Sequence, residues 1–262
     1  MIIQKIEMAL YKILKNFLPI KLLDFYHSAL YKSKILTYLT GHRYRGTPTY
    51  SGDPLDKVIY NYLCRITNSK KYNFFIELGA NNGITQSNTK YLELYKNYSG
   101  ILIEPIPKKY KECISNRKKS TMVENVTCVS FDYSGSTIRL TDADLVTKVW
   151  EGDEVNAFKH VSKFGFSKNI FEQSAVTLNS ILEKNNAPTY IDLLSLDVEG
   201  YELEVLKGVD FNKYTFMLLV IECREINILE NYLSEKNYIL IERLSDIDYI
   251  FRHKDSLLRL GK

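Results

Sequence analysis

Two carboxylates and a glycine follow an apolar run in the segment Leu196-Asp197-Val198-Glu199-Gly200. A carboxylate fixed at the end of a buried strand can take the proton of a hydroxyl group or bind a divalent cation. Residues 201 to 208 then resume an apolar pattern with helical spacing, so the acids lie at a strand-to-helix junction. We predict a catalytic site here, with Asp197 as the general base.

A third acid, Glu222, ends another apolar run. Carboxyl ends of neighbouring parallel strands share one edge of a sheet, so Glu222 should lie near Asp197 and Glu199. These three carboxylates have a second interpretation. They could be ligands of a Mg²⁺ ion that binds and acidifies a hydroxyl group of the substrate. His160, in an aromatic stretch, is a second candidate for the base. For Glu202 the favoured role is structural, at the first turn of the helix that follows.

A glycine turn follows an earlier apolar run, in the segment 77–83 with the sequence Glu-Leu-Gly-Ala-Asn-Asn-Gly. Gly79 and Gly83 allow the backbone to approach a ligand closely where a strand passes into a helix. The turn lacks the third glycine of a dinucleotide fingerprint and the Lys-Ser/Thr pair of a phosphate loop. Glu77 would repel phosphate but can hold an ammonium group. An NAD-dependent enzyme is therefore disfavoured.

Glu104 ends the next predicted strand, in Ile103-Glu104-Pro105. A carboxylate at this position can accept both hydroxyl hydrogens of a ribose. An acid for an amino-acid end and an acid for a ribose together predict S-adenosylmethionine as the cofactor. Further cofactor contacts are predicted in the glycine turn, at the start of the next helix and after the second and third strands, at Ala80, Asn81, Gln86, Ser87, Pro105 and Asp132.

Hydrophobic periodicity predicts alternating strands and helices around these acids. Strands are expected at 74–78, 100–103, 126–129, 191–196 and 216–222, with helices at 55–66, 85–95, 108–116, 177–185, 202–206 and 226–234. Two final strands, 238–242 and 249–252, are joined closely enough for an antiparallel hairpin. Residues 141–173 break the rhythm and indicate an insertion over the site. The fold class is thus α/β, a doubly wound, seven-stranded, mostly parallel sheet.

The glycine turn, Ile103-Glu104-Pro105 and the run from Leu196 through Leu206-Lys207-Gly208 make residues 73–252 resemble the FkbM-type S-adenosylmethionine-dependent methyltransferases. The resemblance implies a Rossmann-like class I methyltransferase fold and O-methylation of sugar or polyketide hydroxyls. By position, it implies that the cofactor is lined by Glu77, Gly79, Asn81, Gly83 and Glu104, and that the acceptor faces Asp197 and Glu199.

We therefore expect the acceptor to be a sugar hydroxyl in a polysaccharide or a glycolipid-linked glycan. Two alternatives stay open. One is methylation of a hydroxyl on a small molecule that is not a sugar. The other is a methyltransferase-like binding module without catalysis, which would act in a glycan-assembly complex. Retention of the acids at both predicted halves of the site disfavours the second alternative.

The basic residues are concentrated at the front of the chain. Residues 1–72 hold 12 Lys and Arg against 4 Asp and Glu, whereas residues 73–262 hold 23 against 27. Within residues 1–18, apolar side chains recur on one side of a helix, with lysines between them. We expect an amphipathic helical extension over 1–50, ahead of a methyltransferase domain at 51–262. It would dock on its own domain, on a second subunit as in a homo-oligomer, or on an anionic membrane surface.

Other targeting and partner signals are absent from the sequence. No run of about 18 apolar residues and no cleavage site of a signal peptide is found. The four cysteines are scattered, without the paired spacing of a zinc or redox site. No nucleic-acid-binding motif accompanies the basic segment, so nucleic acid is not an expected partner. The expected location is the cytoplasm, with peripheral attachment to the inner membrane face as its variant.

Overall fold

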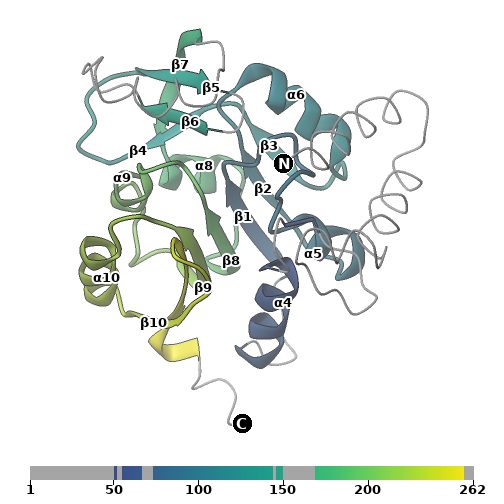
Figure 1. Cartoon of the computed structure of the whole chain (residues 1–262), viewed down its shortest axis with the longest axis vertical. Helices are drawn as coiled ribbons and strands as arrows, with labels where there is room; N and C mark the ends of the chain where they lie inside the picture. The colour runs from purple at the N-terminus through teal and green to yellow at the C-terminus, as the bar shows by residue number, and fades with distance from the viewer. Residues whose placement is uncertain (1–49, 52–54, 67–72, 144–145, 150–168, 257–262) are drawn as a thin grey trace.

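A computed structural model describes residues 50–51, 55–66, 73–143, 146–149 and 169–256 (Figure 1). The predicted amphipathic extension, apart from Tyr50, lies outside these residues, as does His160. Among the described helices, none is both long and apolar enough to cross a membrane.

Seven strands form the main sheet, in the order β10-β11-β9-β8-β1-β2-β3. Their bounds are β1 (Phe74–Leu78), β2 (Ser99–Ile103), β3 (Met122–Glu124), β8 (Tyr190–Leu196), β9 (Thr215–Glu222), β10 (Tyr238–Arg243) and β11 (Asp248–His253). Neighbours from β9 to β3 pair in parallel, and β11 runs antiparallel to both β9 and β10. The predicted seven-stranded sheet with a C-terminal antiparallel hairpin is confirmed.

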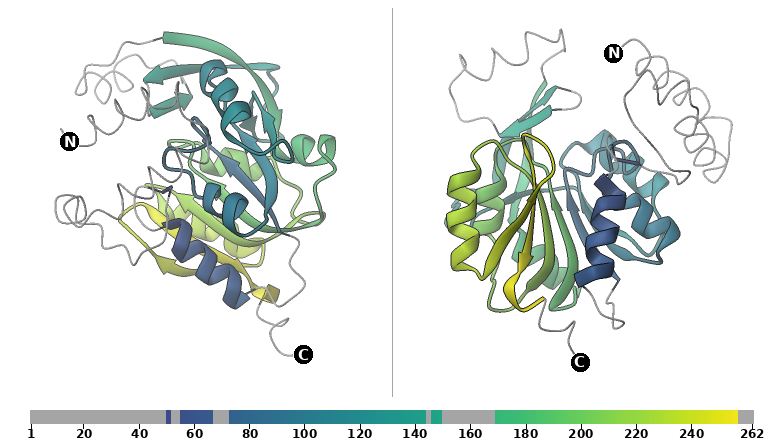
Figure 2. Two further views of the ribbon diagram at one scale, coloured as in Figure 1. Left: turned by 90° about the vertical axis from the view of Figure 1, so that its right-hand side faces the viewer. Right: turned by 60° about the horizontal axis from the view of Figure 1, so that its bottom comes forward.

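Helices cover both faces of this sheet, because successive side chains of a buried strand point to opposite faces. In β1, Phe75 packs with one group of helices and Ile76 with the other. The first group is α4 (Leu55–Ile66), α5 (Lys90–Tyr95) and α6 (Pro107–Asn116); the second is α8 (Leu178–Lys184), α9 (Glu202–Lys207) and α10 (Ile226–Glu235). The right-hand view of Figure 2 shows the sheet between α4 in dark blue and α10 in yellow-green.

A second sheet stands above one end of the first (Figure 1). It has the order β4-β7-β5-β6 and consists of β4 (Thr127–Val129), β5 (Thr137–Ala143), β6 (Val146–Val149) and β7 (Asn169–Thr177). The described part of the predicted insertion belongs to this sheet, and residues 150–168 lie outside the described ranges. Val129 and Leu140 of this sheet belong to a small apolar cluster, against which Tyr201 packs from the start of α9.

The third strand of the main sheet is not the predicted one. Residues 122–124 pair with β2, whereas 127–129 leave the sheet and pair with β7, with Thr127 opposite Ala175. Asn125 marks the point of departure, since its amide donates to the backbone oxygens of Glu104 (2.8 Å) and Pro105 (3.0 Å). The strand predicted at 126–129 is confirmed as β4, but it belongs to the second sheet because its partner β7 is distant in the sequence.

The helix predicted over 85–95 begins only at Lys90. Asn82 Oδ1 accepts hydrogen bonds from the backbone N–H groups of Ile84 (3.0 Å) and Thr85 (2.8 Å), and Gln86 has a positive φ of 59°. These local side-chain bonds compete with helix formation. The glycine turn therefore extends as irregular backbone from residue 79 to 89, which gives it a longer face toward a ligand.

Candidate active site

An open pocket lies at the carboxyl ends of β1, β2 and β8, with the second sheet along one side. The empty space within it, open solvent included, is about 840 Å³. The lining residues come from three places: the glycine turn with the end of β2, the β8–α9 junction, and the second sheet. They are Leu78, Gly79, Asn81, Thr85, Gln86, Ile103, Glu104, Pro105, Lys109, Val126, Thr127, Cys128, Leu140, Val149, Asp197, Val198, Glu199, Tyr201 and Val205.

Gly79 fixes how closely the glycine turn and the acidic junction approach each other. Its φ is +76°, and a Cβ atom added there would lie 1.9 Å from the backbone oxygen of Asp197. The Gly79 N–H donates to the Ile103 oxygen (3.1 Å), and the Asp197 N–H donates to the Leu78 oxygen (3.3 Å). The ends of β2, β1 and β8 are thus pinned side by side, with Asp197 against the turn.

Glu104 lies in the pocket wall, where the sequence predicts a ribose contact. It is buried, and its two carboxylate oxygens accept hydrogen bonds from the backbone N–H groups of Asn81 (2.8 Å) and Ile106 (2.8 Å). Bonds from backbone donors to an ionised carboxylate are strong. Glu104 therefore ties the glycine turn to the end of β2 at the pocket wall.

Glu77 points away from the pocket. It is buried and accepts hydrogen bonds from the hydroxyls of Ser87 (3.0 Å) and Thr89 (2.6 Å) and from the Asn88 N–H (2.8 Å). Arg117 pairs with it at 3.4 Å. Neither Glu77 nor Ser87 lines the pocket, so the structure does not bring these two predicted cofactor contacts to it.

The other predicted cofactor contacts divide in the same way. Asn81, Gln86 and Pro105 line the pocket with Gly79 and Glu104, whereas Ala80 and Gly83 are buried behind the turn. Asp132 is exposed in the turn after β4 and outside the pocket lining. Because β4 leaves the main sheet, Asp132 lies away from the pocket. Val126, Thr127 and Cys128 line the pocket there instead.

Three acids gather opposite the glycine turn. The carboxylates of Asp197, Glu199 and Glu222 each offer an oxygen, and these oxygens lie within 4.8 Å of one another. Burial, followed by the charges of Glu222 and Glu199, raises the pKa of Asp197 well above its usual range. Burial and the charge of Glu199 likewise raise the pKa of Glu222 to about 7. Asp197 Oδ1 is buried and has no hydrogen-bond partner among the described residues, as expected for a group that receives a proton or a ligand.

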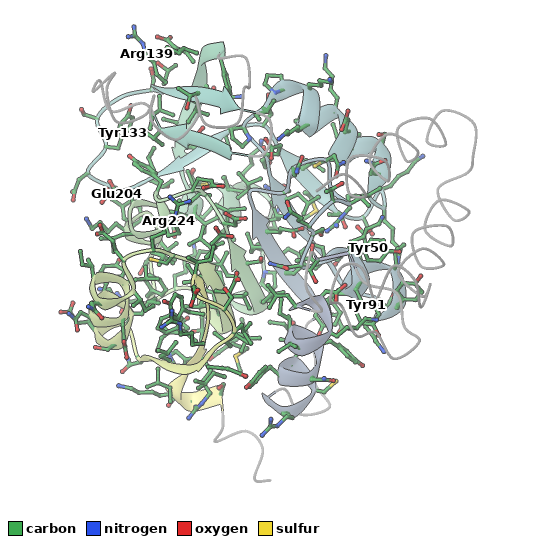
Figure 3. The ribbon with its side chains drawn as sticks, in the orientation of Figure 1. Tyr50, Tyr91, Tyr133, Arg139, Glu204 and Arg224 are labelled. Atoms are coloured by element: carbon green, nitrogen blue, oxygen red, sulfur yellow. The ribbon has the colours of Figure 1, made fainter. Side chains whose placement is uncertain are left out.

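A strained turn presents Glu199 to this cluster. Glu199 has a φ of +57° and Gly200 of +103°. Buried Glu202 holds the turn, because its carboxylate accepts hydrogen bonds from the backbone N–H groups of Val198 (3.3 Å) and Gly200 (2.8 Å). This confirms the structural role favoured for Glu202. Arg224, labelled in Figure 3, pairs with Glu199 at 3.7 Å while its side chain is 56% exposed.

Several lining residues carry no signal in the sequence. Thr85 comes from the glycine turn and Lys109 from α6, whereas Tyr201, which also lines the pocket, is an exception. Leu140 and Val149 come from the second sheet. Its strands pair over long sequence separations, which no local motif predicts. For Tyr201, its place directly after the Asp-Val-Glu-Gly segment is a usable signal, because a residue at that junction must lie at the same edge of the sheet.

A comparison with protein-family models matches residues 77–250 to the "Methyltransferase FkbM domain". The chain belongs to the FkbM methyltransferase family. Membership implies use of S-adenosylmethionine, and it agrees with the strand order of the sheet and with the position of the pocket. The chain is thus an S-adenosylmethionine-dependent methyltransferase.

Solved structures share only a distant likeness with this FkbM methyltransferase. A fibrillarin/Nop5p complex matches with a TM-score of 0.40 and 9% identity over 80% of this chain and 86% of that one. A precorrin-6y C5,15-methyltransferase from Geobacter metallireducens GS-15 gives 0.37 and 10% over 78% and 91%. Human methyltransferase 10 domain containing protein gives 0.39 and 8% over 90% and 98%. No curated protein matches the chain.

In this FkbM methyltransferase the pocket has two chemically different halves. Glu104 and the glycine turn offer carboxylate and backbone groups suited to a nucleoside, with apolar walls at Ile103 and Leu140. The opposite half offers Asp197 and Glu199. A methyl donor bound in the first half would face an acceptor in the second, and close approach along one line is the main demand of methyl transfer.

Proposed function

We propose that this methyltransferase transfers the methyl group of S-adenosylmethionine to a hydroxyl of a sugar, in a polysaccharide or a glycolipid-linked glycan. The observation that carries the proposal is Asp197. Its carboxylate lies in the pocket beside the glycine turn, with one buried oxygen that no described residue occupies and a pKa raised well above the usual range. Such a group is suited to take the proton of a bound alcohol.

The reaction balances with Asp197 as the only base. The acceptor hydroxyl donates a hydrogen bond to the carboxylate, and its oxygen attacks the methyl carbon from the side opposite the sulfur. The oxygen–carbon bond forms as the carbon–sulfur bond breaks, and the hydroxyl proton passes to Asp197. The products are a methyl ether and S-adenosylhomocysteine. Glu104 and the turn would hold the donor in place through the reaction.

A polyhydroxylated acceptor suits the acidic half of the pocket. Each ionised carboxylate can accept several hydrogen bonds, and Glu199 and Glu222 lie within reach of the same place as Asp197. The same charges would repel an acceptor that carries phosphate or carboxylate groups near the methylated hydroxyl. A neutral sugar is therefore favoured over an anionic one, and a small polyol that is not a sugar remains the alternative acceptor.

A metal-assisted variant rests on the same carboxylates. Asp197, Glu199 and Glu222 present oxygen donors at a spacing that a single cation can bridge, and oxygen donors are those that Mg²⁺ prefers. A bound cation would acidify the acceptor hydroxyl in place of a base. Assay of the enzyme after treatment with EDTA, with and without added Mg²⁺, separates the two variants: activity that survives chelation excludes the metal.

The decisive experiment uses isotopically labelled S-adenosylmethionine with glycan extracts of the host, followed by mass spectrometry of the product. We expect label in a methyl ether on a sugar ring, and no label with the Asp197→Asn variant. Label in a small molecule instead would favour the non-sugar acceptor. If S-adenosylhomocysteine binds but no extract is labelled, the binding-module alternative gains and the proposed function fails.

We also infer an attachment for residues 1–50 from their sequence. The alternation of apolar residues and lysines over 1–18 suits an interfacial helix on an anionic membrane, where glycolipid-linked acceptors would be found. The competing occupants are the methyltransferase domain itself and a second copy of the chain. This inference is tested separately from catalysis, with vesicles and a soluble acceptor.

A further inference from the structure

Side chains at the end of α6 bind the glycine turn on the side away from the pocket. Three side chains there donate to three consecutive backbone carbonyls of the turn. The pairs are Cys113 Sγ to the Asn81 oxygen (2.9 Å), Asn116 Nδ2 to the Asn82 oxygen (2.8 Å) and Arg117 Nη1 to the Gly83 oxygen (2.9 Å). We call this set of contacts the carbonyl clamp.

Helical spacing brings the three donors together. Cys113 and Asn116 are related as i and i+3 in the last turn of α6, and Arg117 is the C-cap residue that follows, with its backbone N–H bonded to the Cys113 oxygen. Burial raises the pKa of the Cys113 thiol, which keeps the proton that it donates. A Cβ atom at Gly83 would lie 3.2 Å from Arg117 Cγ and 3.3 Å from Cys113 Cα. A glycine at 83 is what lets the helix reach the turn.

Arg117 joins the clamp to Glu77 and to α5. Its guanidinium is buried and pairs with Glu77 and with Glu93, each at 3.4 Å. Burial alone would raise the pKa of Glu93, but Arg117 and Lys90 outweigh it and lower that pKa, so the carboxylate stays ionised. Lys90 Nζ also donates to the Asn116 backbone oxygen (2.6 Å). Charges buried in this way require partners of opposite sign, and Arg117 receives its partners from β1 and α5.

The clamp determines which groups of the turn face the pocket. The carbonyls of residues 81–83 are bound toward α6, while the Asn81 N–H donates to Glu104 at the pocket wall, at 2.8 Å. We propose that Cys113, Asn116 and Arg117 are positioning residues, which hold the turn in its cofactor-binding conformation before S-adenosylmethionine arrives. A turn ordered in advance loses less conformational entropy on binding, and this improves affinity. None of the three residues lines the pocket.

Asn116→Ala tests the clamp with the smallest disturbance, since it removes one amide donor and leaves the backbone contact to Lys90. We expect the Kd for S-adenosylhomocysteine, measured by calorimetry, to rise about fivefold, the effect of one hydrogen bond. The kcat at saturating S-adenosylmethionine should stay unchanged. Backbone amides of residues 81–87 should exchange hydrogen faster in the ligand-free variant, which a role in stability elsewhere would not cause.

Asn185→Ala is the matched control. Asn185 also follows a helix and donates from its amide to a backbone oxygen, that of Ile181 (3.0 Å), and to Glu124 (2.9 Å), but it does not contact the turn. It should lower Tm comparably and leave the Kd for S-adenosylhomocysteine unchanged. Equal effects of the two variants on Kd, or an unchanged Kd in Asn116→Ala, would overturn the proposal.

Arg117→Lys provides a second variant that keeps the buried charge. A lysine offers one ammonium group and cannot reach Gly83, Thr89 and Glu77 together as the guanidinium fork does. We expect a loss of cofactor affinity larger than that of Asn116→Ala, again with kcat retained at saturation. A folded Arg117→Lys protein that binds the cofactor as tightly as the native protein would also contradict the clamp.

Discussion

Asp197 and Glu77 show how environment assigns different roles to two carboxylates at neighbouring strand ends. Glu77 is surrounded by hydroxyl and N–H donors and by the Arg117 charge. Asp197 is surrounded by acids and has a buried oxygen without a partner among the described residues. The first carboxylate is bound by these donors and holds the turn, and the second, whose pKa is raised, is suited to exchange a proton. Both follow similar apolar runs, so the sequence alone assigns both to ligand contact.

Asp197→Asn should lower kcat by about 10²- to 10⁴-fold, the usual contribution of a general base. The amide has nearly the same shape, so the Kd for S-adenosylhomocysteine should change little. Because burial and neighbouring acids raise the pKa of Asp197, kcat/KM of the native enzyme should fall as the pH decreases through that raised pKa. Steady-state assays from pH 5 to 9 measure this limb. Native activity in the variant would place the base elsewhere.

Glu222→Gln should stabilise the protein at high pH. In the folded protein the pKa of Glu222 is about 7, above the usual 4.5, so the folded state binds more protons between these values. Stability must then decrease as pH rises through this window, because a charge is formed among other acids. At pH 8 we expect Tm to rise by about 2 to 4 °C, which corresponds to about 1 kcal/mol. At pH 5 the difference should vanish.

The control for this measurement is Glu204→Gln, which removes a carboxylate on α9 that pairs with Lys207 at 2.7 Å. It should lower Tm slightly or leave it unchanged at both pH values, since exposed pairs contribute little. If Glu222→Gln and the native protein have the same Tm at pH 8, the ionised Glu222 carboxylate does not destabilise the folded state.

The site lies at junctions between strands and helices. Two glycines at these junctions allow the effect of backbone strain to be distinguished from that of a steric clash. Gly79 and Gly200 both have positive φ, but an added Cβ at Gly79 would meet the Asp197 oxygen at 1.9 Å, whereas one at Gly200 would meet nothing within 4 Å. Strain alone should cost Gly200→Ala about 1 to 2 kcal/mol. Gly79→Ala must also push β1 away from β8. We expect its Tm loss to be at least twice as large, with loss of cofactor binding; thermal unfolding and calorimetry measure both.

Elements with local signals were predicted almost to the residue. The strand expected at 74–78 is β1, and the one expected at 191–196 is β8 with one residue more, because each apolar run ends at a glycine or an acid. The helix expected over 85–95 begins only at Lys90, because side-chain bonds from Asn82 redirect the backbone. The strand expected at 126–129 forms as β4, but in the second sheet, because its partner β7 is distant in the sequence. The sequence did not predict a role for Arg117, because the run Asn116-Arg117-Lys118-Lys119 has the composition of an exposed basic surface.

Across the whole molecule, helices on the two faces of the sheet support different parts of the pocket. Helices α5 and α6 on one face hold the glycine turn through Glu77 and the clamp, and α9 on the other face begins directly after the acidic cluster. Tyr50 and Tyr91, labelled in Figure 3, lie in the core on the α4 and α5 side, away from Arg224 at the acids. The glycine turn and the acidic cluster are thus supported from different faces of one sheet edge.

The charge distribution of the whole chain predicts where the enzyme works. The basic excess lies within residues 1–72, and Lys5, Lys12 and Lys15 interrupt the apolar pattern of residues 1–18. Deleting 1–18 should leave activity on a soluble acceptor intact and should abolish sedimentation with vesicles that contain phosphatidylglycerol. Replacing the three lysines with glutamine keeps the apolar pattern and should weaken vesicle binding about 100-fold, at about 1 kcal/mol for each lysine. If vesicle binding changes neither with these substitutions nor with added salt, an electrostatic attachment is excluded. A change in oligomer size by light scattering, without any vesicle binding, would instead assign the segment to a subunit interface.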